Sequence, residues 1–249
     1  MADTEAKAGE QADTAQDGAG RGAGAGTGRG GGGGGAGRSA YHHGDLRNAL
    51  IDAATDLARD GGPEAVVLRA AARRVGVSPT AAYRHFAGQA ELLHAVKELG
   101  QRRLAESMES AGEPYRSGNS GPGEAEDRVR AIGRGYLAFA RGEPGLYRVA
   151  FCRDPLRVTA SDGLIGHEAE AGSWAFRSFG ILMEALDGLV GHGRMSEERR
   201  TGAEITAWAT VHGLAVLFLD GPLSLLSEQE ADVVAERAFD TLLAGFTAP

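Results

Sequence analysis

The stretch that decides the fold is residues 67–86, VLRAAARRVGVSPTAAYRHF, whose order of residues indicates two short helices joined by a tight turn. Gly76 can adopt a positive φ just past a helix end, where a side chain would clash. Ser78 can then cap a second helix by accepting a backbone hydrogen bond from its first turn. Pro79 suits the first position of that helix, because its φ is already fixed and it has no N–H to leave unpaired. The stretch therefore predicts a helix-turn-helix motif.

The second helix of the motif is expected to be short, with about two turns from Pro79 to about His85. Its outward-facing residues should be Ser78, Thr80, Ala81 and Arg84, and its inward-facing residues should be Ala82 and Phe86. The first helix should pack one apolar face inward, formed by Leu68, Ala71, Ala72 and Val75.

A helix-turn-helix motif points to DNA, because its second helix can enter the major groove with its first residues against the base edges. Thr80 and Ala81 are small enough to let the helix approach closely, and a methyl group of either can touch a thymine methyl. Tyr83 and His85 can each donate a hydrogen bond to a phosphate. An ordinary pair of core helices, in which Tyr83 and His85 only close the core, would have the same punctuation, so both interpretations stay open.

The rest of the chain also has the apolar pattern of helices. Apolar residues recur three and four positions apart in residues 46–57 and again in residues 235–246. Further helical stripes lie at residues 92–104, 129–140, 176–190 and 205–219. No stretch shows the sustained alternation of a half-buried strand, so the sequence predicts an all-α fold.

The first part of the chain has a different composition. The protein has 249 residues, 42% of them hydrophobic, which is enough for one or two domains. Residues 1–37 hold 14 of the 39 glycines and no leucine, isoleucine, valine or aromatic residue. Such a segment cannot offset an ordering entropy of about 1 to 2 kcal/mol per residue. We therefore expect residues 1–37 to be a flexible extension.

Charge separates the rest of the chain into two parts, within a net charge of -8. Residues 38–104 carry ten basic and seven acidic side chains, whereas residues 105–249 carry 13 and 22. A polyanion would meet only the basic module, because the acidic body would repel it. The alternative is that a charge difference of this size between the two parts is ordinary surface variation. A linker is expected near residues 112–123, where proline and glycine cluster.

Several classes of protein are disfavoured. Cys152 is the one cysteine, so the chain can form no internal disulfide and needs no oxidising compartment. The longest nearly apolar run, residues 213–219, is far shorter than the roughly 18 residues that span a bilayer. We expect a cytoplasmic protein with no membrane contact. His167 and Glu168 lack the second histidine of a zinc-protease helix. We therefore expect no catalytic residue, no metal and no cofactor. The alternative is an all-α enzyme that also carries a helix-turn-helix motif.

Residues 41–93 resemble the DNA-binding domain of the tetracycline-repressor (TetR) family of bacterial transcription regulators over its whole three-helix module. The resemblance rests on Gly62, Leu68, Arg69, Ala72, Gly76, Val77, Ser78, Tyr83, His85, Phe86, Glu91 and Leu92 at the family spacing. It implies a DNA-binding domain at residues 44–104, in which Arg69 reaches a base or a phosphate while Tyr83 and His85 hold phosphates. The candidate DNA-binding residues are Arg69, Ser78, Pro79, Thr80, Ala81, Tyr83, Arg84, His85 and Gln89.

Three positions depart from the family pattern. Val67 stands where a threonine or serine usually caps the first helix of the motif, and Ala71 replaces a larger aliphatic residue. Gln89 replaces a lysine that commonly meets a phosphate, so we expect a shallower salt dependence of DNA binding. Three side chains of the preceding arm could compensate, namely Arg38, His42 and His43.

By the same resemblance, residues 105–249 form a helical ligand-binding and dimerisation domain. Trp208, His212 and Gly213 are similar to the Trp-His-Gly signature of one class of TetR C-terminal domain. A second aromatic-rich stripe consists of Trp174, Phe176, Phe179 and Met183. A small apolar ligand is expected between the two stripes, in a pocket lined by Trp174, Phe179, Met183, Trp208 and His212. The alternative is that both stripes are ordinary core and that His212 is a hydrogen-bonded core histidine.

Together with these patterns, the resemblance implies a homodimeric transcription regulator, a repressor that binds a palindromic operator and releases it when a small molecule binds. Residues 205–219 and 233–246 are apolar enough to pack on a twin pair as a four-helix interface. The two half-sites should lie about 34 to 36 Å apart, or a multiple of that distance. The alternative is a DNA-binding regulator controlled by a partner protein or by its own abundance, with no small-molecule effector.

Overall fold

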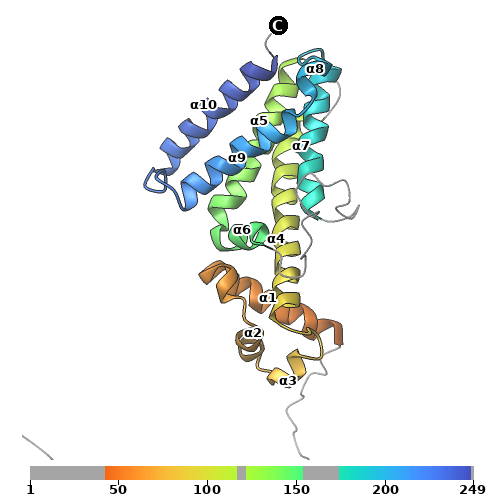
Figure 1. The fold of residues 1–249 in the computed structure, drawn as a ribbon, viewed down its shortest axis with the longest axis vertical. Coiled ribbons are helices and arrows are strands. Elements are labelled where there is room, and N and C mark those ends of the chain that lie inside the picture. Colours follow the sequence, from red (N-terminus) through yellow and green to blue (C-terminus); the bar gives the residue numbers. More distant parts are fainter. Residues whose placement is uncertain (1–42, 117–121, 154–173, 248–249) are drawn as a thin grey trace, which may run out of the picture. The chain divides into compact units, whose positions relative to one another are not determined.

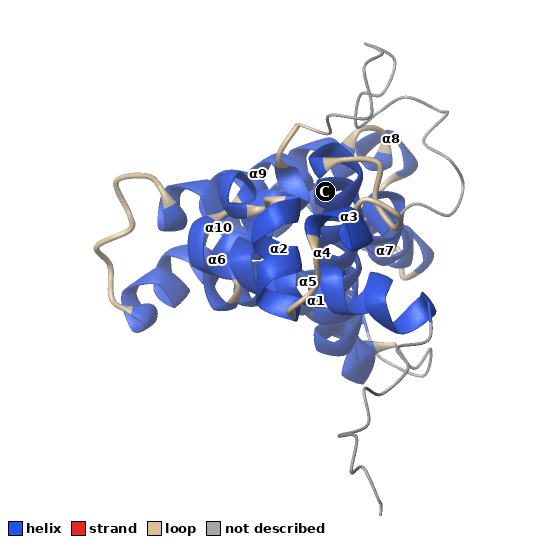
Figure 2. Cartoon of the chain, turned by 90° about the horizontal axis from the view of Figure 1, so that it is seen from below, coloured by secondary structure: helices blue, strands red, loops and turns tan. Residues whose placement is uncertain are grey.

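The computed structural model describes residues 43–116, 122–153 and 174–247, and every regular element among them is a helix (Figures 1 and 2). The α-helices are α1 (His43–Gly61), α2 (Leu68–Val75), α3 (Pro79–Ala82), α4 (Gln89–Gly112), α5 (Pro122–Gly142), α6 (Pro144–Phe151), α7 (Trp174–Gly191), α8 (Glu197–Arg200), α9 (Ala203–Leu219) and α10 (Glu228–Thr247). Two short 3-10 helices are Pro63–Ala65 and Glu113–Tyr115. The predicted all-α fold is confirmed, whereas the expected extension at residues 1–37 lies outside the described residues.

Helices α1, α2 and α3 enclose a small core of their own. The fully or almost fully buried side chains of this core are Leu50, Ala54, Leu68, Ala72, Ala82 and Phe86. On α1 and α2 these residues recur four positions apart, which is the spacing that brings side chains to one face of a helix. The core leaves the opposite faces of α2 and α3 free for contact with other molecules.

Helix α4 connects this module to the rest of the chain without a break. It packs against α1 and also against α5, α6 and α7. Leu104 and Ala105, on either side of the expected domain boundary, both lie within α4 and are fully buried. The division at residue 104 therefore stays a proposal, and the two parts share one helix. The expected linker at residues 112–123 begins where α4 ends.

The body is built from α5, α6, α7 and α9, with α10 packed against α5 and α9 (Figure 1). Its buried core includes Ile132, Leu137, Leu146, Leu186, Leu189 and Ala215. The sequence pattern did not predict α6, because buried residues follow one another in this short helix and leave no clear period. No helix in the described ranges is long and apolar enough to cross a membrane.

Three ion pairs connect α5 with α10. Arg134 makes two hydrogen bonds to Glu236, of 2.6 and 2.7 Å, and Arg130 and Arg141 each reach an aspartate of α10. The partners are Asp240 and Asp232, respectively. Exposed ion pairs contribute little free energy individually, typically below about 1 kcal/mol each, so the three mainly orient α10 along α5.

Candidate nucleic-acid interface

The turn of the helix-turn-helix motif has the geometry that its sequence predicts. Gly76 ends α2 in the left-handed region, with φ 78° and ψ 27°. The N–H of Gly76 donates to the Arg73 carbonyl, and the N–H of Val77 donates to the Ala72 carbonyl at 2.9 Å. These bonds satisfy carbonyl groups at the helix end and turn the chain toward Ser78.

Helix α3 starts at the predicted residue but is shorter than predicted. Ser78 Oγ accepts a hydrogen bond of 3.2 Å from the Ala81 N–H, and Pro79 occupies the first helical position. The α-helix ends at Ala82, rather than near His85, and residues 83–85 continue in tighter turns. The α-helix ends there because the Arg84 and His85 N–H groups donate to carbonyls three residues earlier in the chain, instead of four. Val67 makes no side-chain cap to α2.

The inward and outward faces of α3 agree with the prediction. Ala82 and Phe86 are fully buried, so they fix the helix on the core. Tyr83 is 47% exposed, which a contact with a phosphate would require. Ser78, Pro79, Thr80 and Arg84 are also exposed, while Ala81 and His85 are half-buried. The motif therefore presents hydroxyl groups, methyl groups and a guanidinium on one accessible surface.

Unpaired positive charge borders this surface. Arg69, in the first turn of α2, and Arg84, just after α3, are exposed and form no ion pair with any described residue. Arg74 lies on the same helix as Arg69 but faces two aspartates of α1, at 3.8 Å from Asp56 and 3.7 Å from Asp60. Arg69, Arg73 and Arg84 are thus exposed guanidinium groups that form no ion pair with a described residue and are available for an anionic partner.

The structure adds Arg47 to the candidate DNA-binding residues and gives the position of Gln89. Arg47 of α1 holds its guanidinium 4.8 Å from the centre of the Phe86 ring, a cation–π contact that orients the charge beside α3. Nothing in the local sequence pattern links residues 47 and 86, so sequence reasoning did not predict this contact. Gln89 is the exposed first residue of α4. Arg38 and His42 and the side chain of His43 lie outside the described residues.

A second group of polar residues lies inside the body. The hydroxyl groups of Tyr136 (α5) and Tyr147 (α6) lie 2.7 and 2.9 Å from His212 Nδ1 on α9, and 3.2 Å from each other. Burial lowers the pKa of His212 and raises the pKa of Tyr147 to about 12. Neutral His212 can accept a hydrogen bond from one hydroxyl at Nδ1, and that hydroxyl can accept from the other. His212 is therefore half-buried and hydrogen-bonded, and its place in a ligand pocket stays a prediction.

Aromatic rings surround this polar trio of Tyr136, Tyr147 and His212. The Phe151 ring lies 4.8 Å from the His212 ring, and Trp208 contacts the rings of both Tyr136 and Phe179. Sequence reasoning singled out Trp208, Phe179 and His212 but missed Tyr136, Tyr147 and Phe151, which lie on other helices. The side chains of Trp174 and Phe176 lie outside the described residues, and Met183 is exposed.

A small cavity adjoins the trio. It has a volume of about 30 Å³ and is lined by Met108, Val129, Ile132, Gly133, Tyr136, Leu182, Ala207, Trp208, Val211, Phe239 and Leu242. Pockets for drug-sized ligands have volumes of about 300 to 1,000 Å³, so this cavity has room for little more than a water molecule. Neither Phe179 nor Met183 lines it.

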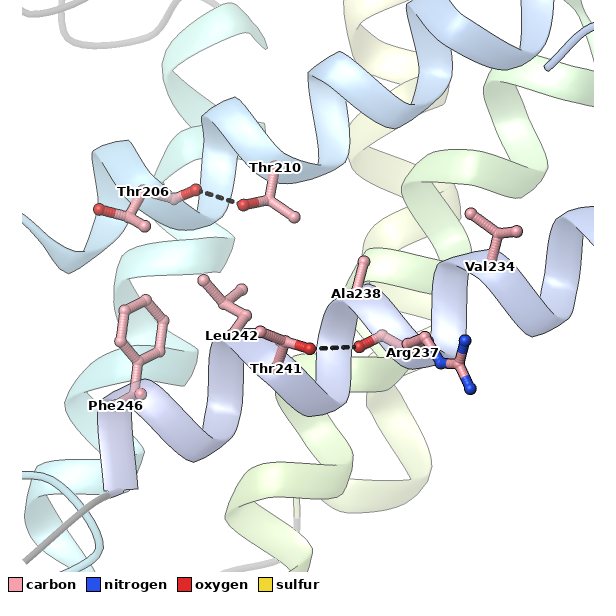
Figure 3. A pocket seen from close by; sticks show the side chains of 9 residues that line it. Thr206, Thr210, Val234, Arg237, Ala238, Thr241, Leu242 and Phe246 are labelled. Atoms are coloured by element: carbon pink, nitrogen blue, oxygen red, sulfur yellow. Dashed lines mark hydrogen bonds between the residues drawn. The ribbon is translucent and has the colours of Figure 1, made fainter.

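A larger groove of about 670 Å³ runs between α9 and α10 (Figure 3). Its lining consists of Thr206, Thr210, Val234, Arg237, Ala238, Thr241, Leu242, Gly245 and Phe246. The hydroxyl groups of Thr210 and Thr241 donate to carbonyls of their own helices, at 2.8 and 2.9 Å. Their methyl groups remain for contact with another molecule. Exposed Ile205 and Val216 on α9 and Val233 on α10 extend the apolar character of this pair of helices.

Two family descriptions match the chain. Residues 50–96 match "Bacterial regulatory proteins, tetR family", and residues 129–242 match "Tetracyclin repressor-like, C-terminal domain". The first match contains α2 and α3, and the second contains α6, α9 and most of α10. The finer similarity of the body to the Trp-His-Gly class is not confirmed. No curated protein matches the sequence.

Solved structures of other proteins have the same fold. A protein of unknown function from Rhodococcus sp. RHA1 has a TM-score of 0.65 and 26% identity, over 84% of this chain and 100% of that chain. The TetR family transcriptional regulator PfmR from Thermus thermophilus has a TM-score of 0.55 and 17% identity, over 82% of this chain and 98% of that one. A tetR-family regulatory protein from Rhodococcus RHA1 has a TM-score of 0.54 and 16% identity, over 82% and 98%. With its helix-turn-helix geometry and both family matches, the chain belongs to the TetR family of bacterial transcription regulators.

Proposed function

We propose that the chain is a repressor that binds a palindromic operator as a homodimer, with α3 of each copy in a major groove. The observation that carries this proposal is the accessible surface of the motif. Small side chains are exposed at the start of α3, and Arg69 of α2 and Arg84 just after α3 are exposed and form no ion pair with a described residue. A surface of this kind suits a polyanion with readable edges, and no catalytic role is proposed for the chain.

The candidate residues divide into two roles. Thr80 and Ala81, at the start of α3, would contact base edges and set the sequence preference. Tyr83, Arg84 and His85 would contact phosphates and fix the register of the helix, because phosphate contacts carry no sequence information. Ser78 and Pro79 would hold the start of α3 in place, Arg69 would reach a base or a phosphate, and Gln89 would add a neutral contact at the start of α4.

The homodimer would form through α9 and α10. Their groove and exposed apolar side chains are suited to a second copy of the same pair of helices, which would bury the methyl groups of Thr210 and Thr241. Two copies related by a two-fold axis would present two α3 helices to successive major grooves. The palindrome of the operator would follow from that symmetry.

An effector, if one acts on this chain, would bind near Trp208, Phe179 and His212 and lower operator affinity. A 100-fold loss would need about 2.7 kcal/mol of coupling. The second candidate function is a regulator with no small-molecule effector. The cavity of about 30 Å³ beside Trp208 favours this second candidate, because an effector would have to open the body before it could bind. Thermal unfolding of the protein with a panel of small apolar compounds separates the two candidates.

Selection of random duplex DNA by the purified protein, followed by sequencing, tests the proposed function. The size of the bound species should be measured in the same buffer, at moderate salt. An enriched palindrome bound by a dimer supports the proposal. A folded protein that enriches no sequence, or that binds an asymmetric site as a monomer, contradicts it.

A further inference from the structure

Helix α6 lies at the contact between the helix-turn-helix module and the body. Glu143, immediately before α6, accepts hydrogen bonds of 2.6 and 3.1 Å from Nε and Nη2 of Arg59, near the end of α1. The same carboxylate accepts a hydrogen bond of 3.1 Å from Nη1 of Arg103 on α4. Arg59 holds the pKa of Glu143 below its usual range, so the carboxylate stays charged at neutral pH. One half-buried side chain thus ties α6 to α1 and α4.

The backbones of α6 and α1 also touch. A Cβ atom added at Gly145 would lie 2.1 Å from the Ala58 carbonyl oxygen and 2.6 Å from the Arg59 carbonyl oxygen. Real side chains do not approach this closely, so the contact requires glycine. A Cβ atom at Gly100 of α4 would similarly lie 3.1 Å from Cβ of Ala150. These approaches fix the distance of α6 from α1 and α4, but a contact through one glycine leaves rotation about it possible.

Helix α4, which continues from the module into the body, holds α6 at its other end. The buried side chain of Gln101 donates a hydrogen bond of 3.1 Å to the Ala150 carbonyl, and Lys97 Nζ donates one of 2.7 Å to the Cys152 carbonyl. Tyr147 joins α6 to α5 and α9 through the polar trio. Helix α6 is therefore held by α4, α5 and α9, and Glu143 is its charged connection to α1.

We propose that Glu143 is a positioning residue for operator binding, whose ion pairs with Arg59 and Arg103 set the orientation of the helix-turn-helix module on the body. This inference rests on the proposed function. In a two-fold dimer, the orientation of each module determines the separation of the two α3 helices. The Glu143 contact consequently selects the half-site spacing that the dimer accepts, without touching DNA.

The test compares operators that differ only in the number of base pairs between their half-sites. The spacing penalty is the ratio of the dissociation constant for an operator lengthened or shortened by one base pair to that for the selected operator. Removing a bidentate ion pair of about 1 kcal/mol should lower this penalty about fivefold in Glu143→Ala. Glu143→Gln, which keeps one acceptor oxygen, should give a smaller reduction. Arg59→Ala combined with Glu143→Ala should add little beyond either single change.

Asp56→Asn is the matched control. Asp56 accepts a hydrogen bond of 2.9 Å from the same guanidinium of Arg59 but lies on α1 itself, so the pair does not cross to α6. Glu143→Ala and Asp56→Asn each remove one negative charge, so both variants change the nonspecific attraction of the protein to DNA equally. The spacing penalty should stay at the wild-type value in Asp56→Asn. Binding to a duplex with a single half-site checks that every variant still has a folded motif.

The possible outcomes separate this inference from the function on which it rests. If the wild-type protein binds no palindrome in a spacing-dependent way, the proposed function is wrong. If it does, and Glu143→Ala keeps the wild-type penalty while binding the single half-site normally, only the positioning role of Glu143 is wrong. An equal reduction in Asp56→Asn would also contradict it. A variant that loses the single half-site is replaced by Glu143→Gln, to which the same criteria apply.

Discussion

Replacing Gly145 by alanine should destabilise the protein through the contact between α6 and α1. The added Cβ would lie 2.1 Å from the Ala58 carbonyl oxygen and 2.8 Å from Cα of Arg59. Favourable contacts between such atoms need about 3.5 Å, so the helices must separate by about 1 Å or more. Overpacking of this kind costs about 1 to 3 kcal/mol, and the better helix propensity of alanine recovers less than about 1 kcal/mol. We expect a net loss of about 2 kcal/mol.

Urea unfolding followed by circular dichroism measures this loss, at one protein concentration because a dimer's stability depends on it. Gly142→Ala is the control, since the added Cβ at this position meets no atom within 4 Å. That variant should change stability by less than about 0.5 kcal/mol. The corresponding fall in Tm for Gly145→Ala is about 4 to 8 °C. Equal stabilities of the two variants would refute the close approach of α6 to α1.

Three further predictions concern the motif and the polar trio. Tyr83→Phe should weaken binding to selected and random duplexes by a similar factor, because a phosphate contact is independent of sequence; a loss confined to the selected operator in binding titrations would contradict that role. Thr80→Leu should change the selected DNA sequence or abolish specific binding, and an unchanged sequence in the random-duplex selection would refute the assignment of α3. The third concerns pH. Because burial lowers the folded-state pKa of His212 below 6.5, the unfolded chain binds more protons below that pH, so stability should fall as the pH drops from 7.5 to 5.5. His212→Asn should reduce this fall in urea unfolding, and an identical pH dependence would exclude His212 as a source.

The helix-turn-helix motif could be predicted because its signals are local. Gly76, Ser78 and Pro79 lie within four positions, and each acts through its own backbone geometry or through an N–H group one turn away. The one error there, the length of α3, arose because three-residue hydrogen bonds after Ala82 leave no mark in an apolar pattern. The exposure of Tyr83 agrees with its predicted contact to a phosphate.

The body was less predictable because its contacts join distant parts of the chain. Tyr136 and Tyr147 are 76 and 65 residues from His212, so no local spacing points to the polar trio. Gly145 follows a proline and reads as a helix start, whereas its role depends on the position of the Ala58 carbonyl. Similarly, the carboxylate of Glu143 meets Arg59 from 84 positions away. Long-range packing, rather than propensity, decides these positions.

The proximity of Glu143 and Tyr147 bears on how an effector would act. The two residues are one helical turn apart, and the Tyr147 N–H donates to the Glu143 carbonyl at 2.8 Å. The small cavity beside Trp208 is lined by residues of α4, α5, α7, α9 and α10. An effector that enlarged it by moving α9 away from α5 would stretch the hydrogen bond of His212 to Tyr136 and disturb the one to Tyr147 on α6. Any resulting shift of α6 would reach Glu143 through a single turn of helix, and the backbone contact at Gly145 would transmit it to α1. Loss of operator affinity would then arise from a changed half-site spacing, with the DNA-contacting surface of α3 itself unaltered.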